Sequence, residues 1–529
     1  MNSTSPSTVS STGASTVLPV TGGMPQEKWR TDRWATVGIW VVILYTIFRN
    51  AFAAAAKPFW FDELCTVAVA RQPNFSAMWT AFGQAEDSAT PLFWLVEHYF
   101  ARLIPNQEIA YRLPSILAFG CVLWCLFVFV RRRSGATVAF LCALVPILTP
   151  LYKPYAIEAR GYSLVVACVS IALVCYQRAS RSFWVFFMAL GLMAAEAFHY
   201  YAFFCFVPFG LAELAWILRR KELRWGVWIA LFAGFLPIAA GWHHLMEVKQ
   251  FYGTHFWGQA SLTLAANAYG LLLKMFAPIA VGVVAVLSVV ALWMALFPES
   301  TRAVECGETD DHSHEPMLAV GFLSILLVEL VVTKIVHGSL VERYALATAL
   351  GLALATGYLV LMLGWRSVAL VAVFLLMAIS LDEGSFWLSE RGRLGKLDSP
   401  ASSVETLVTA AGYSDLPVVV SDEHQYVQLA YYASPEWGSR FVGLVDPQSA
   451  IAYAGSDSLD RQVSVLPCCL ALRVYDFQAF SPDHPRFLLY SDGADFDWWA
   501  RRLVADGYGV RILIADASRE VSLVSRNNL

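Results

Sequence analysis

The feature that most constrains this chain is a series of apolar runs, each long enough to cross a lipid bilayer as a helix. About eleven runs can be drawn, with approximate limits 34–55, 112–130, 136–152, 161–177, 183–198, 201–218, 225–242, 279–297, 317–333, 344–363 and 366–381. A spanning helix needs roughly 20 apolar residues. The charged share of 15% is also low, since soluble domains carry about a quarter. The sequence therefore predicts a polytopic α-helical membrane protein with about 11 transmembrane helices, which occupy residues 34–382.

The N-terminal segment 1–33 is rich in Ser and Thr and lacks the basic start and apolar stretch of a secretory signal. We expect it to be a disordered cytoplasmic tail. The ten cysteines lie mostly in or beside apolar runs and show no metal-ligand spacing, so we expect no disulfide framework. The net charge of −4 gives no reason to expect a nucleic-acid partner.

The positions of Lys and Arg predict how the chain is oriented. Basic clusters lie at 28–33, 131–133, 178–181 and 219–224. Because cytoplasmic connections carry most Lys and Arg, these clusters place the N-terminus in the cytoplasm. The connections at about 56–111, 153–160, 243–278 and 334–343 then face outward, and the C-terminal region lies on the same side. We expect a multi-pass protein of the cell inner (plasma) membrane.

Residues 383–529 change in character. Strand-like runs at 418–420, 486–491, 510–515 and 521–525 alternate with helical stretches such as 496–507. This pattern predicts a small extracytoplasmic α/β domain of ordinary domain size.

The first outer connection, 56–111, carries two acidic pairs. Asp62-Glu63 follows the first span in KPFWFDELC, and Glu86-Asp87 follows in EDSATPLFW. A carboxylate near hydrocarbon is costly, and two neighbours in a partly dry site shift each other's pKa, which suits a base or a cation ligand. The alternative is an ordinary polar loop end. Whether Asp62 and Asp87 together bind a divalent cation stays an open question, and the sequence identifies no cofactor.

Arginines recur on the predicted outer face, although the cytoplasmic side normally carries the positive charge. They are Arg112 in YRLPS, Arg160 in YKPYAIEARGYSL and Arg343 in VERYAL. Each could be an interfacial anchor, but together they indicate an anionic ligand, because a guanidinium binds phosphate through paired donors. Secondary candidates on the same face are Glu86, Lys153, Glu158, His199 and Tyr344.

The ordered motifs FDEL, DSATPLFW, YRLPSILAFG, EARGYSL and ERYAL, within about residues 34–365, resemble membrane glycosyltransferases of the GT-C type. The nearest group is the bacterial branch related to protein O-mannosyltransferases and the lipid A aminoarabinose transferase. The resemblance implies transfer of a sugar from a polyprenyl-phosphate carrier to a lipid, glycan or protein acceptor outside the membrane, usually with inversion.

The same resemblance implies roles for individual residues. Asp62 would be the catalytic base, with Glu63 and Asp87 as further acidic site residues. Arg112, Arg160 and Arg343 would bind the donor phosphate. One departure concerns residues 89–90, where Ala-Thr stands in place of the His or Lys that many relatives carry before the proline.

Two other function classes remain open. A transporter or flippase of lipid-linked sugar would place ionisable residues near the middle of several spans. Here most charges lie at span ends, although Glu196, Glu213 and Glu329 lie within or near apolar stretches. A non-catalytic scaffold would leave the clustered outer Asp and Arg residues unexplained.

Overall fold

The structure is a computed structural model that describes residues 25–85, 90–253, 255–258, 260–276, 314–336, 338–363, 365–391, 396–397, 399–493, 497–516 and 518–526. The expected span 279–297, the acidic pair Glu86-Asp87 and most of the expected tail lie outside these residues.

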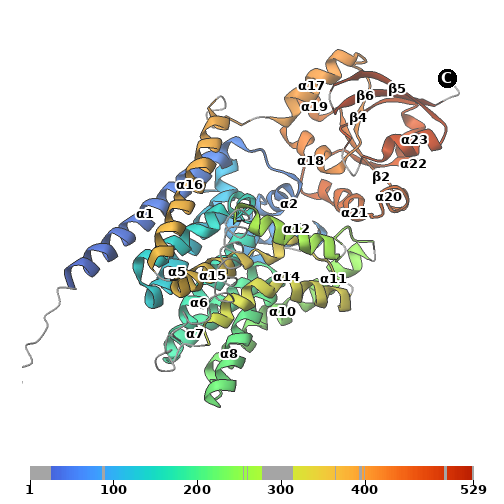
Figure 1. The fold of residues 1–529 in the computed structure, drawn as a ribbon. Coiled ribbons are helices and arrows are strands. Elements are labelled where there is room, and N and C mark those ends of the chain that lie inside the picture. Colours follow the sequence, from blue (N-terminus) through green and yellow to red (C-terminus); the bar gives the residue numbers. More distant parts are fainter. Residues whose placement is uncertain are drawn as a thin grey trace, which may run out of the picture.

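A bundle of apolar helices forms the larger part of the molecule (Figure 1). Its helices are α1 (Pro25–Ala56), α5 (Gln107–Leu144), α6 (Tyr162–Tyr176), α7 (Ser182–Phe198), α8 (Val207–Arg220), α9 (Trp225–Gly234), α10 (Leu236–Ala240), α14 (Pro316–Val336), α15 (Thr348–Leu363) and α16 (Trp365–Glu390). Within the described residues, six helical segments are long and apolar enough to cross a membrane, or up to seven if the bent pair 225–240 and 242–252 forms one span. Every expected span other than 279–297 coincides with an apolar helix, which confirms the polytopic helical architecture.

Helix α5 covers two of the expected spans. It bends at Gly135, where φ is +79°, a value that glycine adopts more readily than residues with a Cβ. Asn106 caps its start, because the Asn106 side chain accepts a hydrogen bond from the Ile109 N–H at 2.8 Å. The helix begins before the expected limit of 112, so Pro114 lies in its interior and not in its first turn.

Helices α1 and α16 extend beyond the limits expected from the sequence. Helix α1 begins at Pro25, so the last part of the expected tail is helical. Helix α16 continues to Glu390, past the expected domain boundary at 382. The two helices contact each other where Tyr45 donates a hydrogen bond of 2.5 Å to Glu383.

Short helices join the bundle on the side where α2 lies. They are α2 (Phe61–Ala70), α3 (Phe75–Ala85), α4 (Pro91–Phe100), α11 (Trp242–Tyr252) and α12 (Leu262–Leu273), with 3-10 turns η1 (Val145–Leu148), η2 (Pro154–Ile157), η3 (Tyr200–Phe206), η4 (Lys274–Phe276) and η6 (Glu342–Ala345). Trp79 on α3 is 53% exposed. Phe82 and Trp94 are buried against each other, with ring centroids 4.4 Å apart.

The C-terminal region forms a separate α/β unit at one end of the bundle (Figure 1). Its six-stranded sheet has the order β3-β2-β1-β4-β6-β5, in which β4-β6 and β6-β5 are antiparallel pairs and the others parallel. The strands are β1 (Val418–Val420), β2 (Phe441–Val445), β3 (Val474–Asp476), β4 (Arg486–Ser491), β5 (Tyr508–Ala515) and β6 (Glu520–Arg526). The helices are α17 (Pro400–Ala411), α18 (Glu423–Tyr432), α19 (Pro435–Gly438), α20 (Pro447–Ala454), α21 (Ser458–Val465), α22 (Phe477–Asp483) and α23 (Trp499–Ala505), with turn η7 (Leu466–Cys468). The expected α/β domain is confirmed, and β2 and β3 are strands that the sequence did not reveal.

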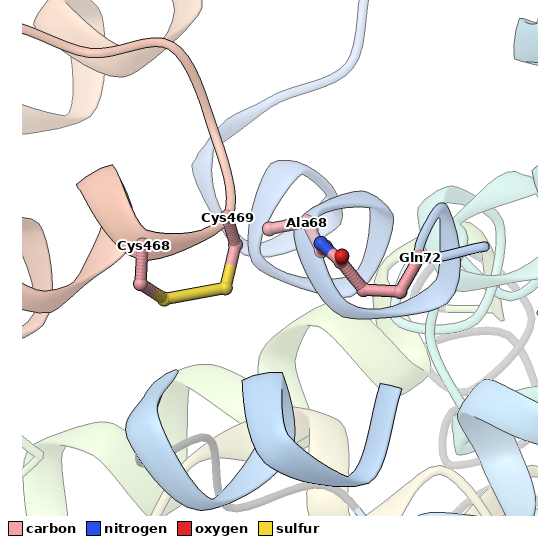
Figure 2. The surroundings of a disulfide bond; sticks show 4 residues. All are labelled: Ala68, Gln72, Cys468 and Cys469. Atoms are coloured by element: carbon pink, nitrogen blue, oxygen red, sulfur yellow. A yellow bond between two sulfur atoms is a disulfide. The ribbon is translucent and has the colours of Figure 1, made fainter. Parts of the chain in front are cut away.

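A disulfide joins the adjacent residues Cys468 and Cys469. The sequence led us to expect none, because spacing rules describe cysteines that lie apart in the chain, and this pair is contiguous. Figure 2 shows the disulfide with Ala68 and Gln72 from the neighbourhood of α2 beside it. It therefore lies where the C-terminal domain meets the first outer connection.

Candidate active site

A buried ion pair lies at the centre of the candidate site. Glu63 and Arg112 have fully buried side chains, and Arg112 Nε and Nη2 donate to the two Glu63 carboxylate oxygens at 2.7 and 2.6 Å. The remaining guanidinium hydrogens reach the backbone oxygens of Ala54, Lys57 and Pro58 at 2.5 to 3.0 Å. A guanidinium has five N–H donors. All five are used here, so none is left for a ligand.

Glu63 links three parts of this end of the helical bundle. Besides Arg112, its carboxylate accepts hydrogen bonds from the backbone N–H groups of Trp60 at 3.2 Å and Ala159 at 2.8 Å. Burial opposes its ionisation, but the charge and hydrogen bonds of Arg112 hold the pKa of Glu63 below its ordinary value. The end of the first span, helix α2 and the 153–160 connection are thereby fixed to the start of α5.

Asp62 lies next to this pair but faces a different partner. Its Oδ2 atom is 3.1 Å from Arg343 Nη2, and the two side chains are 16% and 13% exposed. Arg160 approaches from another connection and donates from Nη1 to the Asp62 backbone oxygen at 3.2 Å and to Thr66 Oγ1 at 3.4 Å. One carboxylate and two guanidinium groups are thus gathered from three separate connections.

Aromatic side chains line the space around these charges. The guanidinium carbons of Arg160 and Arg343 each lie 5.8 Å from the centre of the Tyr162 ring. His199 packs on Tyr162 and Tyr344, with ring centroids 5.2 and 4.9 Å away. Arg343, Tyr162, His199 and Tyr344 border a narrow pocket with a volume of about 10 Å³.

His199 is held as a neutral ring in this pocket. Its Nδ1 atom accepts a hydrogen bond from the Tyr201 N–H at 3.2 Å. Burial, with the charges of Arg160 and Arg343, lowers the pKa of His199 to about 3. The buried Nε2 atom of His199 and hydroxyl of Tyr162 have no hydrogen-bond partner among the described residues. Both polar atoms are therefore available to a ligand.

Glu158 adds a second carboxyl group close to the ion pair. Its Oε1 atom lies 3.8 Å from Lys57 Nζ, and its side chain is 7% exposed. Burial, opposed by the Lys57 charge, raises the pKa of Glu158 to about 7. This carboxyl group therefore changes its protonation state near neutral pH.

Some predicted site residues lie elsewhere. Lys153 forms an ion pair with Asp382 on α16, beside Arg49, so it belongs to the contact between α16 and the bundle. Among the described residues no group of three or more His, Cys, Asp or Glu side chains could hold a metal ion. Asp87 is outside those residues, so the cation at Asp62 and Asp87 stays a prediction.

The C-terminal domain covers the chain just before Asp62. On α18, Tyr432 accepts a hydrogen bond from the Phe59 N–H at 2.8 Å, and Gln428 donates to the Phe59 backbone oxygen at 2.7 Å. The His424 ring packs edge-on against Phe61, with centroids 5.0 Å apart. The segment that carries Asp62 is therefore held by Arg112 on one side and by α18 on the other.

Sequence reasoning missed several of these residues. Lys57 was visible as the cation of KPFW next to the acidic pair, and Tyr162 as the aromatic residue that follows Arg160. No sequence signal relates α18 to Phe59, because hydrogen bonds between distant segments depend on how the two domains pack.

The chain matches no protein-family model and no curated protein. It is similar in structure to ArnT from Cupriavidus metallidurans in the apo state, with a TM-score of 0.55, 13% sequence identity, and coverage of 92% of this chain and 98% of that one. A structure of the same ArnT bound to undecaprenyl phosphate gives a TM-score of 0.51 with the same identity and coverage. At this identity the likeness establishes the fold, a polytopic helical bundle with a C-terminal α/β domain.

Proposed function

We propose that this protein is a glycosyltransferase that takes a sugar from a polyprenyl-phosphate carrier. The observation that carries the proposal is the partly buried ion pair between the Asp62 carboxylate and the Arg343 guanidinium, with the Arg160 guanidinium bonded to the Asp62 backbone oxygen beside it. The fold supports it, because a structure with the same architecture holds undecaprenyl phosphate.

In this proposal Asp62 is the catalytic base. Its carboxylate takes the proton of an acceptor hydroxyl as that oxygen forms a bond to the anomeric carbon of the sugar. The bond between the anomeric carbon and the phosphate oxygen breaks, and the electron pair leaves with the lipid phosphate. One displacement of this kind inverts the anomeric configuration.

Arg343 and Arg160 stabilise the departing phosphate. Charge builds up on that phosphate in the transition state, and fixed cationic donors at low solvent exposure stabilise it strongly. Because Arg343 is paired with Asp62 here, the donor phosphate would compete with the carboxylate for the guanidinium. Donor binding would then release Asp62 to act as the base.

Glu63 and Arg112 take a positioning role in this proposal. The sequence assigned Glu63 to catalysis and Arg112 to the phosphate, but every donor of Arg112 is bonded to the protein. A buried ion pair that also binds the backbone on both sides of α2 fixes where Asp62 points.

Polar and aromatic residues around the Asp62–Arg343 pair are of the kinds that bind sugars. His199 and Tyr162 offer buried polar atoms, and Glu158 adds a carboxyl group. Sugar hydroxyls need such donors and acceptors, while Tyr344 supplies an aromatic surface. Glu86 and Asp87 stay predicted members of the site, and the acceptor is a lipid, glycan or protein.

We place this site on the outer face of the inner membrane. The basic connections gather at the other end of the bundle: Arg131 pairs with Asp32 at 3.6 Å, and Arg133 with Glu315 at 2.7 Å. A cytoplasmic position for that end follows from the excess of Lys and Arg.

The test is sugar transfer by the full chain in detergent. The purified protein is incubated with a radiolabelled polyprenyl-phosphate sugar as donor and with membrane extract as the source of acceptor. A parallel reaction contains the nucleotide-linked form of the same sugar as donor. Transfer from a polyprenyl-phosphate donor is expected. Transfer from nucleotide sugars in extracts free of polyprenyl phosphate would overturn the proposal.

A lipid-linked sugar flippase is the second candidate, because of two carboxyl groups inside the bundle. Glu196 on α7 and Glu329 on α14 are fully buried, and neither has a hydrogen-bond partner among the described residues. Buried ionisable groups in apolar helices are common along transport paths. Movement of a labelled lipid-linked sugar across proteoliposomes without sugar transfer would favour this function, and loss of movement in Glu196→Gln with Glu329→Gln would assign it to these residues.

A further inference from the structure

A second pocket lies at the opposite end of α2 from Asp62. Residues near the C-terminal ends of α2 and α4, the first turns of α5, and Tyr431 on α18 border an open pocket with a volume of about 400 Å³. At 1.5 Å per helical residue, Ala70 in this pocket is about 12 Å along α2 from Asp62. The volume is in the range of ordinary small-ligand sites.

The charges around this pocket are positive. The charged residues that line it are Arg71 and Arg102, and no Asp or Glu is among the lining residues. Arg102 donates to the backbone oxygens of His98 at 3.3 Å and Pro73 at 3.1 Å, which uses part of its capacity. The Arg71 side chain makes no hydrogen bond or ion pair with the described residues. The arrangement therefore suits an anion.

Neighbouring groups strengthen this preference. The pocket includes Gln107, the first residue of α5, and the start of a long helix attracts negative charge. Glu97, next to His98 in the chain, is fully buried, and Glu108 follows Gln107 in the first turn of α5. Burial, with the nearby charge of Glu63, raises the pKa of Glu97 well above its ordinary value. This shift favours the uncharged form of the Glu97 carboxyl group.

An apolar ledge beside the pocket indicates that the anion belongs to an amphiphile. Tyr99 and Leu103 are one helical turn apart and are 62% and 68% exposed, on either side of Arg102. The pocket also lies at the level of the membrane surface, since the apolar span of α1 ends at Ala56 and that of α5 begins at Gln107. A phosphate group with acyl chains would place its charge between the arginines and its chains along the ledge.

We propose that the pocket between α2, α4, α5 and α18 binds the net-anionic phosphate headgroup of a membrane lipid. The inference does not rest on the proposed sugar transfer. Because Tyr431 comes from the C-terminal domain and the other lining residues from the membrane domain, the bound headgroup would bridge the two domains.

The test measures lipid binding by the full chain in neutral detergent. Phosphatidylglycerol and phosphatidylcholine with identical acyl chains are titrated, and bound lipid is counted by native mass spectrometry. The variant Arg71→Gln with Arg102→Gln is compared with Arg486→Gln and Arg511→Gln, an equal charge change on exposed strand residues of the sheet. We expect the first variant to bind phosphatidylglycerol about 10-fold more weakly, because each lost guanidinium contact removes a charge-assisted hydrogen bond, and the second to bind like the unaltered protein.

Equal binding of phosphatidylglycerol by the pocket variant and the unaltered protein would overturn the proposal. A second arm separates a lipid from free phosphate: Tyr99→Ser with Leu103→Ser should weaken lipid binding but leave inorganic phosphate unaffected. Inorganic phosphate that binds as tightly as the lipid would overturn the lipid assignment. Asp62→Asn should bind phosphatidylglycerol normally, so a failure of the proposed sugar transfer can be told apart from a failure here.

Discussion

Arg343 Nη2 lies 3.1 Å from Asp62 Oδ2, although the two residues belong to the first and last outer connections of the helical bundle. Neither side chain is more than 16% exposed, so the pair is screened less than a surface salt bridge. The closure of the bundle brings them together, and the pair defines where a phosphate and an acceptor hydroxyl would meet.

Replacement of Arg343 should weaken donor binding. Arg343→Gln removes a charged contact to the donor phosphate, a loss of about 2 kcal/mol, which lowers donor affinity roughly 30-fold. Arg343→Lys should lose less, because the charge stays while the paired donors are lost. Donor titration of the detergent-purified protein checks this, with Arg511→Gln as the control, and an unaltered donor affinity in Arg343→Gln would contradict the role.

The Glu63–Arg112 pair should show its structural role in unfolding measurements. Arg112→Met leaves the Glu63 carboxylate buried and unpaired, which should lower the free energy of unfolding by about 3–5 kcal/mol. The double variant Arg112→Met with Glu63→Met should lose less free energy of unfolding than either single variant, because it leaves no unpaired buried charge. If Arg112 bound the donor instead, Arg112→Lys would weaken donor binding without any change in thermal stability.

A substitution of Tyr432 tests whether the C-terminal domain positions Asp62. Tyr432→Phe leaves the Phe59 N–H without its acceptor, at a cost of about 1–3 kcal/mol, and should loosen the segment before Asp62. We expect a lower kcat with little change in donor affinity, since misplacement of a reacting group slows the chemical step. Tyr453→Phe on α20 is the matched control, and equal kcat values for the two variants would show that α18 does not position the site.

Because of Asp460, the stability of the folded protein should depend on pH. It is 1% exposed in the C-terminal domain, and burial raises its pKa from 3.8 to about 7. The folded chain therefore keeps this proton to a higher pH than the unfolded chain does. As a result, the contribution of Asp460 to the free energy of unfolding is fully present below about pH 4 and is lost as the pH rises to about 7. Asp460→Asn should therefore raise the melting temperature at pH 8 but not at pH 4; a variant that melts lower at pH 8 would reverse the predicted sign.

The apolar runs predicted the helices well because a spanning helix must satisfy its backbone hydrogen bonds internally, which leaves a long local signal. Strands β1, β5 and β6 were also visible as runs with several Val or Ile residues, and β4 as the apolar run in RFLLYS. Strand β3 was not, since its sequence VYD has no apolar run and it takes its conformation from pairing with β2.

The candidate site was predicted in part. The location of Asp62, Arg160, His199 and Arg343 at one end of the bundle followed from the predicted topology alone, because alternate connections of a bundle lie at the same end. What could not be derived was which arginine faces which carboxylate. Arg112 and Arg343 carry the same charge at similar span ends, and only side-chain packing buries the first against Glu63 and directs the second to Asp62.

The most direct test of the account is the rate of sugar transfer by Asp62→Asn. The substitution keeps the size of the side chain but removes the base, so kcat should fall about 10² to 10⁴-fold while donor binding and melting temperature are retained. Glu63→Gln, in contrast, should lower the melting temperature. Full transfer activity in Asp62→Asn, with folding and donor binding unchanged, would show that Asp62 is not the catalytic base.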